Sequence, residues 1–430
     1  MKWLRRLALL ILLLVLLLAS WLFLGNRERE PEPSAATRAD PAALRDPLLI
    51  ARGEYLATVG DCASCHTRQG GARYAGGRLL ATPFGQLPSS NLTPDRDTGL
   101  GGWSFEEFWR ALHSGKGRGG MLLYPAFSYT SFTKVSRADA LAIFAYLQSL
   151  PAVRQSPTPL QLSFPYDVRN SLLVWRALYF KEGEYRNDPA RSAQWNRGAY
   201  LVQGLAHCNE CHVQRDALGG VPNGQPLSGG LIPAQNWYAP DLSLQQNGGL
   251  QGWREQDIVD LLKTGQSPKG VALGPMAEVV MQSTQYLHDD DLQAIATYLH
   301  ALPPRAAPVV ADSSIDVAAI VGQGAKIYQQ HCADCHGVDG NGIAGVYPPL
   351  NGNASVNEPS GINATRAILL GGFAPPTAGQ PRPYSMPPFA QQLSDADVAA
   401  VVTYIRQAWS NRAPLVQERD VGKGRDPSLD

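Results

Sequence analysis

The sequence has no net charge and little sulfur. Its 37 basic and 37 acidic residues balance, so the chain has no broad electrostatic attraction for nucleic acid, and no nucleic-acid partner is expected. Only five methionines are present, which limits the thioether sulfurs that could bind a metal. All six cysteines fall within three short motifs, so no cysteine is left over.

The three motifs are copies of Cys-x-x-Cys-His. The cysteines are Cys62, Cys65, Cys208, Cys211, Cys332 and Cys335, and the histidines are His66, His212 and His336. Two thiols on one turn can each add to a vinyl group of haem, and the histidine that follows can then bind the iron. The sequence therefore predicts three covalently bound haem c groups with these histidines as proximal ligands.

Two other uses of paired cysteines fit less well. A structural zinc site needs a second pair of ligands within roughly 12–20 residues, and the three motifs lie much farther apart than that. A redox dithiol needs a strand-to-helix context, and it gives no reason for a histidine after every pair.

The N-terminus is a membrane-targeting segment. Lys2, Arg5 and Arg6 precede an apolar run over residues 7–24, in which only Ser20 is polar. The run is long enough to cross a bilayer as a helix, and no clear cleavage site follows it. We expect an uncleaved anchor, with a cleaved signal as the alternative, and the basic flank places the bulk of the chain outside the cytoplasm.

The remaining sequence predicts a mainly α fold of three tandem class I cytochrome c domains behind the N-terminal transmembrane helix. The 42 glycines and 33 prolines favour loop-rich domains of short helices over a large sheet. The expected divisions are 1–26 (anchor or signal), 27–47 (linker), 48–154 (first domain), 155–194 (inter-domain segment), 195–304 (second domain), 305–317 (linker), 318–411 (third domain) and 412–430 (a loosely held tail).

Each domain is expected to begin with a helix that leads to its motif and to end with a closing helix. The helices are expected over 49–59, 104–113, 137–150, 255–264, 289–302 and 395–409. The apolar, aromatic stretch 172–180 is expected to pack between domains, with a partner-binding surface as the alternative. Two Gly-x-Gly-x-x-Gly matches, 115–120 and 340–345, follow no expected strand, so nucleotide binding is rejected.

A second iron ligand can be sought among the methionines. Spacing from the motif and from the closing helix selects Met386 in the third domain. In the second domain, Met276 and Met281 both fit that spacing.

The first domain has no methionine at the matching position. Met121 lies within range of its motif but too far from its closing helix, where the spacing favours Phe127, which cannot bind iron. His113 is the alternative ligand, although a surface position is its expected role. His207 and His331 are adjacent to motif cysteines and are expected to be structural.

Several stretches outside the motifs form a further pattern. They are Thr82-Pro83-Phe84-Gly85, Asn91-Leu92-Thr93-Pro94-Asp95, Leu123-Tyr124-Pro125-Ala126, Trp195-Asn196-Arg197-Gly198-Ala199-Tyr200-Leu201, Gly274-Pro275-Met276-Ala277-Glu278-Val279-Val280 and Ser385-Met386-Pro387. Through them, residues 49–411 resemble the three-haem cytochrome c subunits of bacterial membrane-bound dehydrogenases for alcohols, gluconate, fructose and aldehydes, and of some molybdenum hydroxylases.

The resemblance implies that a separate catalytic subunit oxidises the substrate and passes electrons to these haems, which relay them to membrane ubiquinone or another acceptor. It implies a position at the inner membrane, with the bulk of the chain on the periplasmic side. It also favours Met276 over Met281, whereas many relatives have methionine where this chain has Phe127. The alternative function is a haem reductase or peroxidase that uses an open first site.

Overall fold

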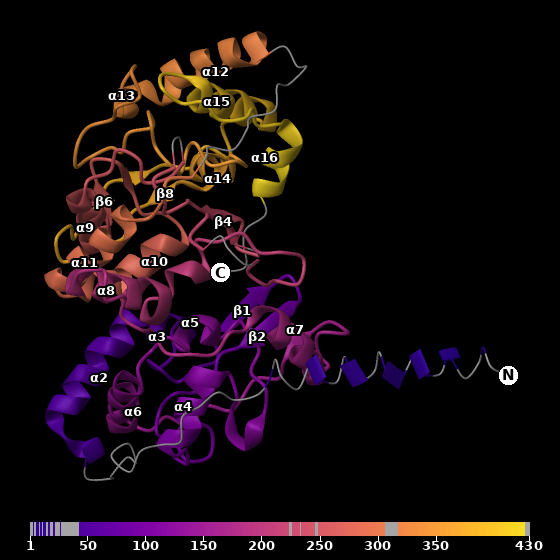
Figure 1. The fold of residues 1–430 in the computed structure, drawn as a ribbon. Helices are drawn as coiled ribbons and strands as arrows, with labels where there is room; N and C mark the ends of the chain where they lie inside the picture. Colours follow the sequence, from indigo (N-terminus) through magenta and orange to yellow (C-terminus); the bar gives the residue numbers. More distant parts are fainter. Residues whose placement is uncertain are drawn as a thin grey trace.

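The computed structural model describes residues 43–222, 226–232, 234–245, 248–305 and 317–425, with scattered positions before residue 27. Helices dominate this part of the chain, and its strands form only sheets of two or three strands. The expected mainly helical fold is confirmed. Figure 1 shows three successive parts of the chain, with the purple N-terminal part at the bottom and the orange and yellow C-terminal part at the top.

The first unit follows the expected order of elements. Its elements are α2 (Pro47–Val59), α3 (Cys62–Cys65), β1 (Leu79–Thr82), β2 (Gly85–Pro88), α4 (Phe105–Ser114), η3 (Arg118–Gly120), α5 (Tyr129–Phe132) and α6 (Arg137–Ser149). Ser104 caps α4 by accepting a hydrogen bond from the Glu107 backbone, and the Glu107 side chain accepts one from the Ser104 backbone. This reciprocal cap explains why the start of α4 could be predicted from the sequence.

The second unit repeats this order and adds a helix. Its elements are α8 (Ala193–Tyr200), the π-helical turn η5 (Leu201–Leu205), η6 (Cys208–Glu210), β4 (Gly230–Ile232), β5 (Trp237–Ala239), α9 (Glu255–Thr264), β6 (Gln266–Ser267), β7 (Gly270–Val271), α10 (Pro275–Gln282), η7 (Thr284–Tyr286) and α11 (Asp289–His300). The helix α10 carries both candidate methionines of this unit.

The third unit ends in a helix that the sequence did not predict. Its elements are α12 (Val317–His331), α13 (Ala333–His336), α14 (Ile362–Leu370), β8 (Gly372–Phe373), β9 (Ser385–Met386), α15 (Asp395–Gln407) and α16 (Glu418–Gly424). The prediction of a loose tail is wrong for residues 412–425. Val416 and Val421 are buried in the core of the third unit, and Arg425 pairs with Asp395 at the start of α15.

In every unit the first helix crosses the closing helix at a glycine. A Cβ added at Gly53 would lie 1.9 Å from the carbonyl oxygen of Ala142, and one at Gly198 would lie 1.9 Å from that of Ala294. The equivalent distance from Gly324 in the third unit, to Ala400, is 2.1 Å. The backbones therefore approach too closely for any larger residue, which explains the glycine in each repeat.

The units do not bury their apolar side chains in the same way. The cores of the first and second units form one continuous cluster, in which Leu56 and Val59 belong to the same core as Leu201 and Leu205. The third unit has a core of its own around α12, α14, α15 and α16. The first two units are thus joined by a shared hydrophobic core.

The segment between the first two units contacts both, as expected. It contains β3 (Gln161–Leu162), which extends the β1–β2 hairpin, followed by η4 (Arg169–Ser171) and α7 (Leu172–Tyr179). Arg176 donates a hydrogen bond to the carbonyl oxygen of Ser114 in the first unit. In the second unit, the carbonyl oxygen of Leu218 accepts a hydrogen bond from the indole of Trp175, and the Asp216 carboxylate accepts one from the hydroxyl of Tyr179.

Half of the expected N-terminal anchor, residues 7–24, lies outside the described residues. Within the part of the chain that the structure describes, no helix has both the length and the apolar character that crossing a membrane requires.

Candidate haem-attachment sites

Each motif forms a single helical turn behind a first helix. In the first unit α3 contains Cys62 and Cys65, and Asp61 precedes it in a left-handed conformation with φ 48°. In the second unit His207 takes the same place and conformation, with φ 38°. In these two units a left-handed residue thus separates the first helix from the motif, whereas in the third unit Cys332 follows α12 directly, with φ −123°.

The three motif histidines are oriented by the same interaction. The Nδ1 atoms of His66, His212 and His336 lie 2.6, 2.7 and 3.0 Å from the carbonyl oxygens of Ser90, Pro240 and Pro348. A carbonyl can only accept a hydrogen bond, so Nδ1 carries the proton and Nε2 keeps its lone pair. This is how an iron-binding imidazole is normally held, with the second nitrogen bonded to the protein.

The thiols of Cys62, Cys208, Cys211 and Cys332 are half-buried, whereas those of Cys65 and Cys335 are exposed. Desolvation raises the pKa of Cys62 and Cys208 to about 12, and that of Cys211 and Cys332 to about 11. Metal-binding and redox cysteines are normally stabilised as thiolates, which these surroundings oppose. The described residues contain no group of three or more His, Cys, Asp and Glu that could hold a metal ion. Paired, uncharged thiols followed by an imidazole with a free nitrogen fit covalently bound haem c.

The candidate methionines occupy different positions in the three units. Met386 lies on β9, paired with Gly372 of β8, and it packs partly buried against the third core. Met276 and Met281 both lie on α10 and are half-buried. Met121 directly follows η3 and is exposed. It lies within the turn that is closed by an antiparallel bridge between Lys116 and Leu122.

Two further expectations concern histidines and aromatic residues near the first site. Phe127 packs against Phe132, with 5.5 Å between ring centroids. His113, expected at the surface, is instead buried, so that prediction is wrong: its ring stacks on Trp109 and its Nε2 lies 3.8 Å from a carboxylate oxygen of Glu182. Glu182 belongs to the inter-domain segment, which lies far from α4 in the sequence. The sequence of α4 alone therefore does not indicate that His113 is covered.

His207 and His331 are both expected to be structural, and their surroundings differ. His207 is half-buried, and its Nε2 lies 3.2 Å from the carbonyl oxygen of Gly60 in the first unit. His331 is exposed, with its ring near Phe389. Both Gly-x-Gly-x-x-Gly matches follow helices, α4 and α13, and not strands.

The first and second attachment sites face one another. The His207–Gly60 contact joins the residue directly before Cys208 to the residue two positions before Cys62. Arg78 donates to the carbonyl oxygen of Ser64, inside the first motif, and forms an ion pair with Glu278 of α10. The second unit therefore contacts the first motif directly.

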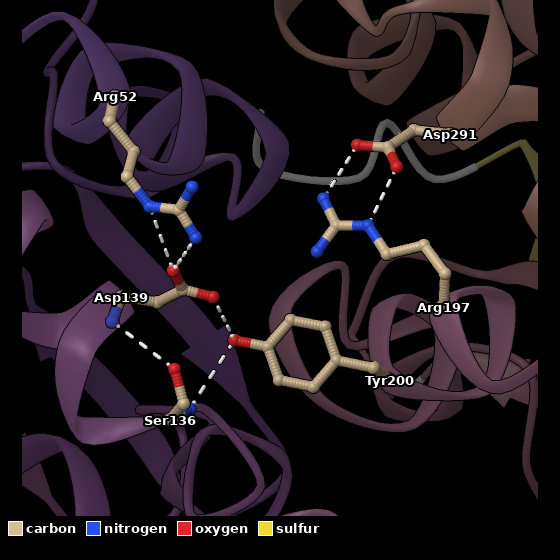
Figure 2. Close-up of polar contacts among 6 residues, drawn as sticks. All are labelled: Arg52, Ser136, Asp139, Arg197, Tyr200 and Asp291. Atoms are coloured by element: carbon tan, nitrogen blue, oxygen red, sulfur yellow. Dashed lines mark hydrogen bonds and ion pairs between the residues drawn. The ribbon is translucent and has the colours of Figure 1, made fainter. Parts of the chain in front are cut away.

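A reciprocal network joins the same two units, and Figure 2 shows its two ion pairs and the contact between Tyr200 and Asp139. Within the units, Arg52 pairs with Asp139 and Arg197 pairs with Asp291. Across the interface, the hydroxyl of Tyr55 donates to Asp291 at 2.6 Å and that of Tyr200 donates to Asp139 at 2.5 Å.

The electrostatics of this network agree with its geometry. Burial raises the pKa of Tyr55 and Tyr200, which keeps both hydroxyls protonated as donors. Burial opposes ionisation of Asp291, but hydrogen bonds from Arg197 and Tyr55 outweigh it and lower the pKa of this carboxyl below its ordinary value.

The sequence shows the repeated Arg-Gly-x-Tyr-Leu but indicates no contact for it. The third unit keeps part of the network, since Gln323 donates to Asp397 at 3.0 Å. It has Lys326 where the other units have Tyr55 and Tyr200. The tyrosine that the first two repeats share, and that the third lacks, is thus the residue that forms the contact across the interface.

The chain has clear relatives among known proteins. The cytochrome c family model matches residues 321–409. The cytochrome c subunit of the alcohol dehydrogenase (quinone) of Gluconobacter oxydans is 38% identical over 88% of this chain and 83% of its own length. The gluconate 2-dehydrogenase cytochrome c subunit of Pantoea cypripedii is 35% identical over 91% of this chain and 92% of its own length.

A longer protein also matches. A nicotinate dehydrogenase subunit of Pseudomonas putida is 41% identical over 86% of this chain, and the match covers 31% of that protein, so this chain spans about a third of it. The alcohol and gluconate dehydrogenase subunits, in contrast, match over most of their length. The chain belongs to the family of cytochrome c subunits of membrane-bound alcohol, gluconate and fructose dehydrogenases.

Proposed function

We propose that this chain is a membrane-anchored c-type cytochrome that carries three haem c groups and relays electrons. The donor is the catalytic subunit of a dehydrogenase, and the acceptor is ubiquinone or another respiratory acceptor. The anchor is residues 7–24 at the inner membrane, and the bulk of the chain faces the periplasm. The observation that carries this proposal is the common arrangement of the three motifs, each with a histidine whose Nδ1 is bonded to a backbone carbonyl.

The domain divisions follow from the same proposal. Residues 48–154, 195–304 and 318–411 are three class I cytochrome c domains, with 155–194 joining the first two and 305–317 leading to the third. The crossing of the first and closing helices at a glycine in each unit supports this division. The C-terminal residues 412–425 belong structurally to the third domain, because α16 packs into its core.

The proposed iron ligands come from these residues. His66, His212 and His336 are the proximal ligands, each with Nε2 left free by the bond at Nδ1. Haem supplies the one-electron chemistry when bound. Met276 and Met386 are the proposed opposite ligands of the second and third haems. Met121 is proposed for the first haem. In the first unit Met121 precedes Leu122, which forms an antiparallel bridge with Lys116 just after α4, and in the third unit Met386 pairs in the same way with Gly372 just after α14.

The function is tested by counting haems and following electrons. The full chain, produced in a bacterium that attaches haem c, should stain for haem on a denaturing gel and contain three haems. Changing both cysteines of one motif to serine should remove one haem, and only one. The catalytic subunit of an alcohol, aldehyde or gluconate dehydrogenase, co-purified with the chain, should reduce the haems when substrate is added, and a soluble ubiquinone analogue should reoxidise them.

Two results would contradict the proposal. Fewer than three haems per chain after complete maturation would contradict the proposed three-haem electron relay. A high-spin first haem that turns over a small molecule without any dehydrogenase would favour the alternative, a haem reductase or peroxidase, since Phe127, which cannot bind iron, occupies the position that the spacing from the closing helix favours.

A further inference from the structure

We propose that α7 and the loop before it, residues 164–178, rest on the surface of the lipid bilayer. This inference rests on the proposed placement of residues 7–24 in that bilayer. It assigns a lipid-contacting surface to the segment between the first and second units, which otherwise has no role in electron transfer.

The charge distribution of α7 is the first argument. Its sequence, Leu-Leu-Val-Trp-Arg-Ala-Leu-Tyr, contains one charged residue. That residue, Arg176, is 2% exposed, whereas Val174 and Leu178, one turn apart, are each 44% exposed. A helix at a water-exposed surface normally has its charges outside and its aliphatic residues inside. The outer face of α7 is apolar, which suits the boundary between lipid headgroups and acyl chains.

The loop before α7 also has exposed apolar side chains, with Asp167, Asn170 and Ser171 exposed among them. The side chain of Phe164 is 81% exposed, and those of Tyr166 and Val168 are also exposed. Aromatic side chains are enriched where a protein meets the membrane–water interface. Exposed apolar side chains therefore recur at intervals from 164 to 178, both in the loop and on α7.

The position of the N-terminal segment is the second and independent argument. Asn26 lies two residues after the apolar run 7–24, a length of chain that spans at most roughly 7 Å. Its Nδ2 donates to the carbonyl oxygen of Leu173 at 3.0 Å, and Nε of Arg176 donates to its Oδ1 at 3.1 Å. Figure 1 shows the N-terminal segment leaving the body of the molecule beside α7. The bilayer that holds this segment must therefore begin next to α7.

Arg176 also fixes α7 to the first unit. Its Nη1 donates to the carbonyl oxygen of Ser114 at the end of α4, at 2.7 Å. Its guanidinium lies over the rings of Tyr129 and Phe180, at 5.4 and 4.6 Å from their centroids. One buried arginine thus joins the residue that follows the anchor, α7 and the first unit, which would hold that unit at a defined distance from the membrane.

Photo-crosslinking of the full chain tests the proposal. The photoreactive residue p-benzoylphenylalanine replaces Phe164, Val174 or Leu178 in separate variants, and the protein is reconstituted in vesicles of phosphatidylethanolamine and phosphatidylglycerol. Ile343 and Phe373 are matched controls, because they are exposed apolar residues of the third unit. Leu12 in the apolar run is the control for the anchor. Haem staining confirms that each variant has matured.

We expect lipid adducts at positions 12, 164, 174 and 178, and none at 343 and 373. No adduct at 12 would overturn the proposed anchor itself. Adducts at 12 without any at 174 and 178 would overturn the α7 proposal alone. Crosslinks from 174 and 178 to a co-purified dehydrogenase subunit, in place of lipid, would also overturn it and would assign this face to a protein partner.

Discussion

At the scale of single residues, the three motif histidines show how a short motif depends on distant backbone. Their acceptors, Ser90, Pro240 and Pro348, lie 24, 28 and 12 residues farther along the chain. The histidines could be predicted because the motif itself requires them. The acceptors could not, because their spacing differs in each unit and any residue can offer a carbonyl oxygen.

The methionine ligands give a prediction at this scale. Replacing Met386 with leucine should leave about a third of the haem five-coordinate and high-spin, because one thioether ligand of three is lost. The reduction potential of that haem should fall. Absorption and spin-resonance spectra of the oxidised protein measure both the spin state and the number of haems affected.

Met281→Leu is the matched control for this prediction. If Met276 is the ligand of the second haem, Met281→Leu leaves every haem low-spin, although both residues lie on α10. A high-spin haem in Met281→Leu would transfer the role to Met281. A fully low-spin Met386→Leu variant would show that Met386 does not bind iron.

At the scale of elements, the helices with strong boundary signals were predicted closely and the others were not. α6 spans Arg137–Ser149 against the expected 137–150, because Ser136 caps its start and Pro151 follows its end. The terminal helix α16 was missed because its sequence, Glu-Arg-Asp-Val-Gly-Lys-Gly, contains one apolar residue and two glycines. Tertiary packing, and not intrinsic propensity, accounts for this helix.

Val421 tests how much α16 stabilises the third unit. Its side chain is fully buried, at 0% exposed, in the core formed with α14 and α15. Val421→Ala removes two buried methyl groups and should lower the free energy of unfolding of this unit by about 2 kcal/mol. Chemical denaturation followed by circular dichroism measures the change. Val338→Ala, at a position that is 70% exposed, should have little effect. Equal effects of the two variants would show that α16 does not stabilise the core.

At the scale of the whole molecule, the units are alike in fold but not in their contacts. The sequence predicts three units in a row, joined by the segment 155–194 and by the shorter linker 305–317, but it does not indicate which contacts form at each junction. In the structure the first and second units share a core and exchange tyrosine–aspartate hydrogen bonds. The third contacts the second differently, through hydrogen bonds that include the pair between Asn363 and the backbone of Tyr238 and the bond from Thr377 to the carbonyl oxygen of Thr264. Lys326 in place of the tyrosine, and Gln323 in place of the arginine, are sequence differences that accompany this asymmetry.

The reciprocal tyrosines provide a test of that asymmetry. Tyr55→Phe and Tyr200→Phe each remove a hydroxyl that donates to a carboxylate across the interface, while Asp291 and Asp139 keep their arginine partners. Each substitution should lower the free energy of unfolding of the joined first and second units by about 1.5–3 kcal/mol.

Electron transfer should respond as well, because the same interface holds the first and second attachment sites opposite each other. We expect the double variant to slow electron transfer between the first two haems, measured by rapid mixing with the reduced dehydrogenase, and to leave the third haem's spectrum unchanged. The control is Tyr328→Phe, which removes a hydroxyl bonded to Gly337 within the third unit and should affect only that unit. If Tyr328→Phe slowed the first transfer as much as the double variant, the network in Figure 2 would have no special part in holding the two haems together.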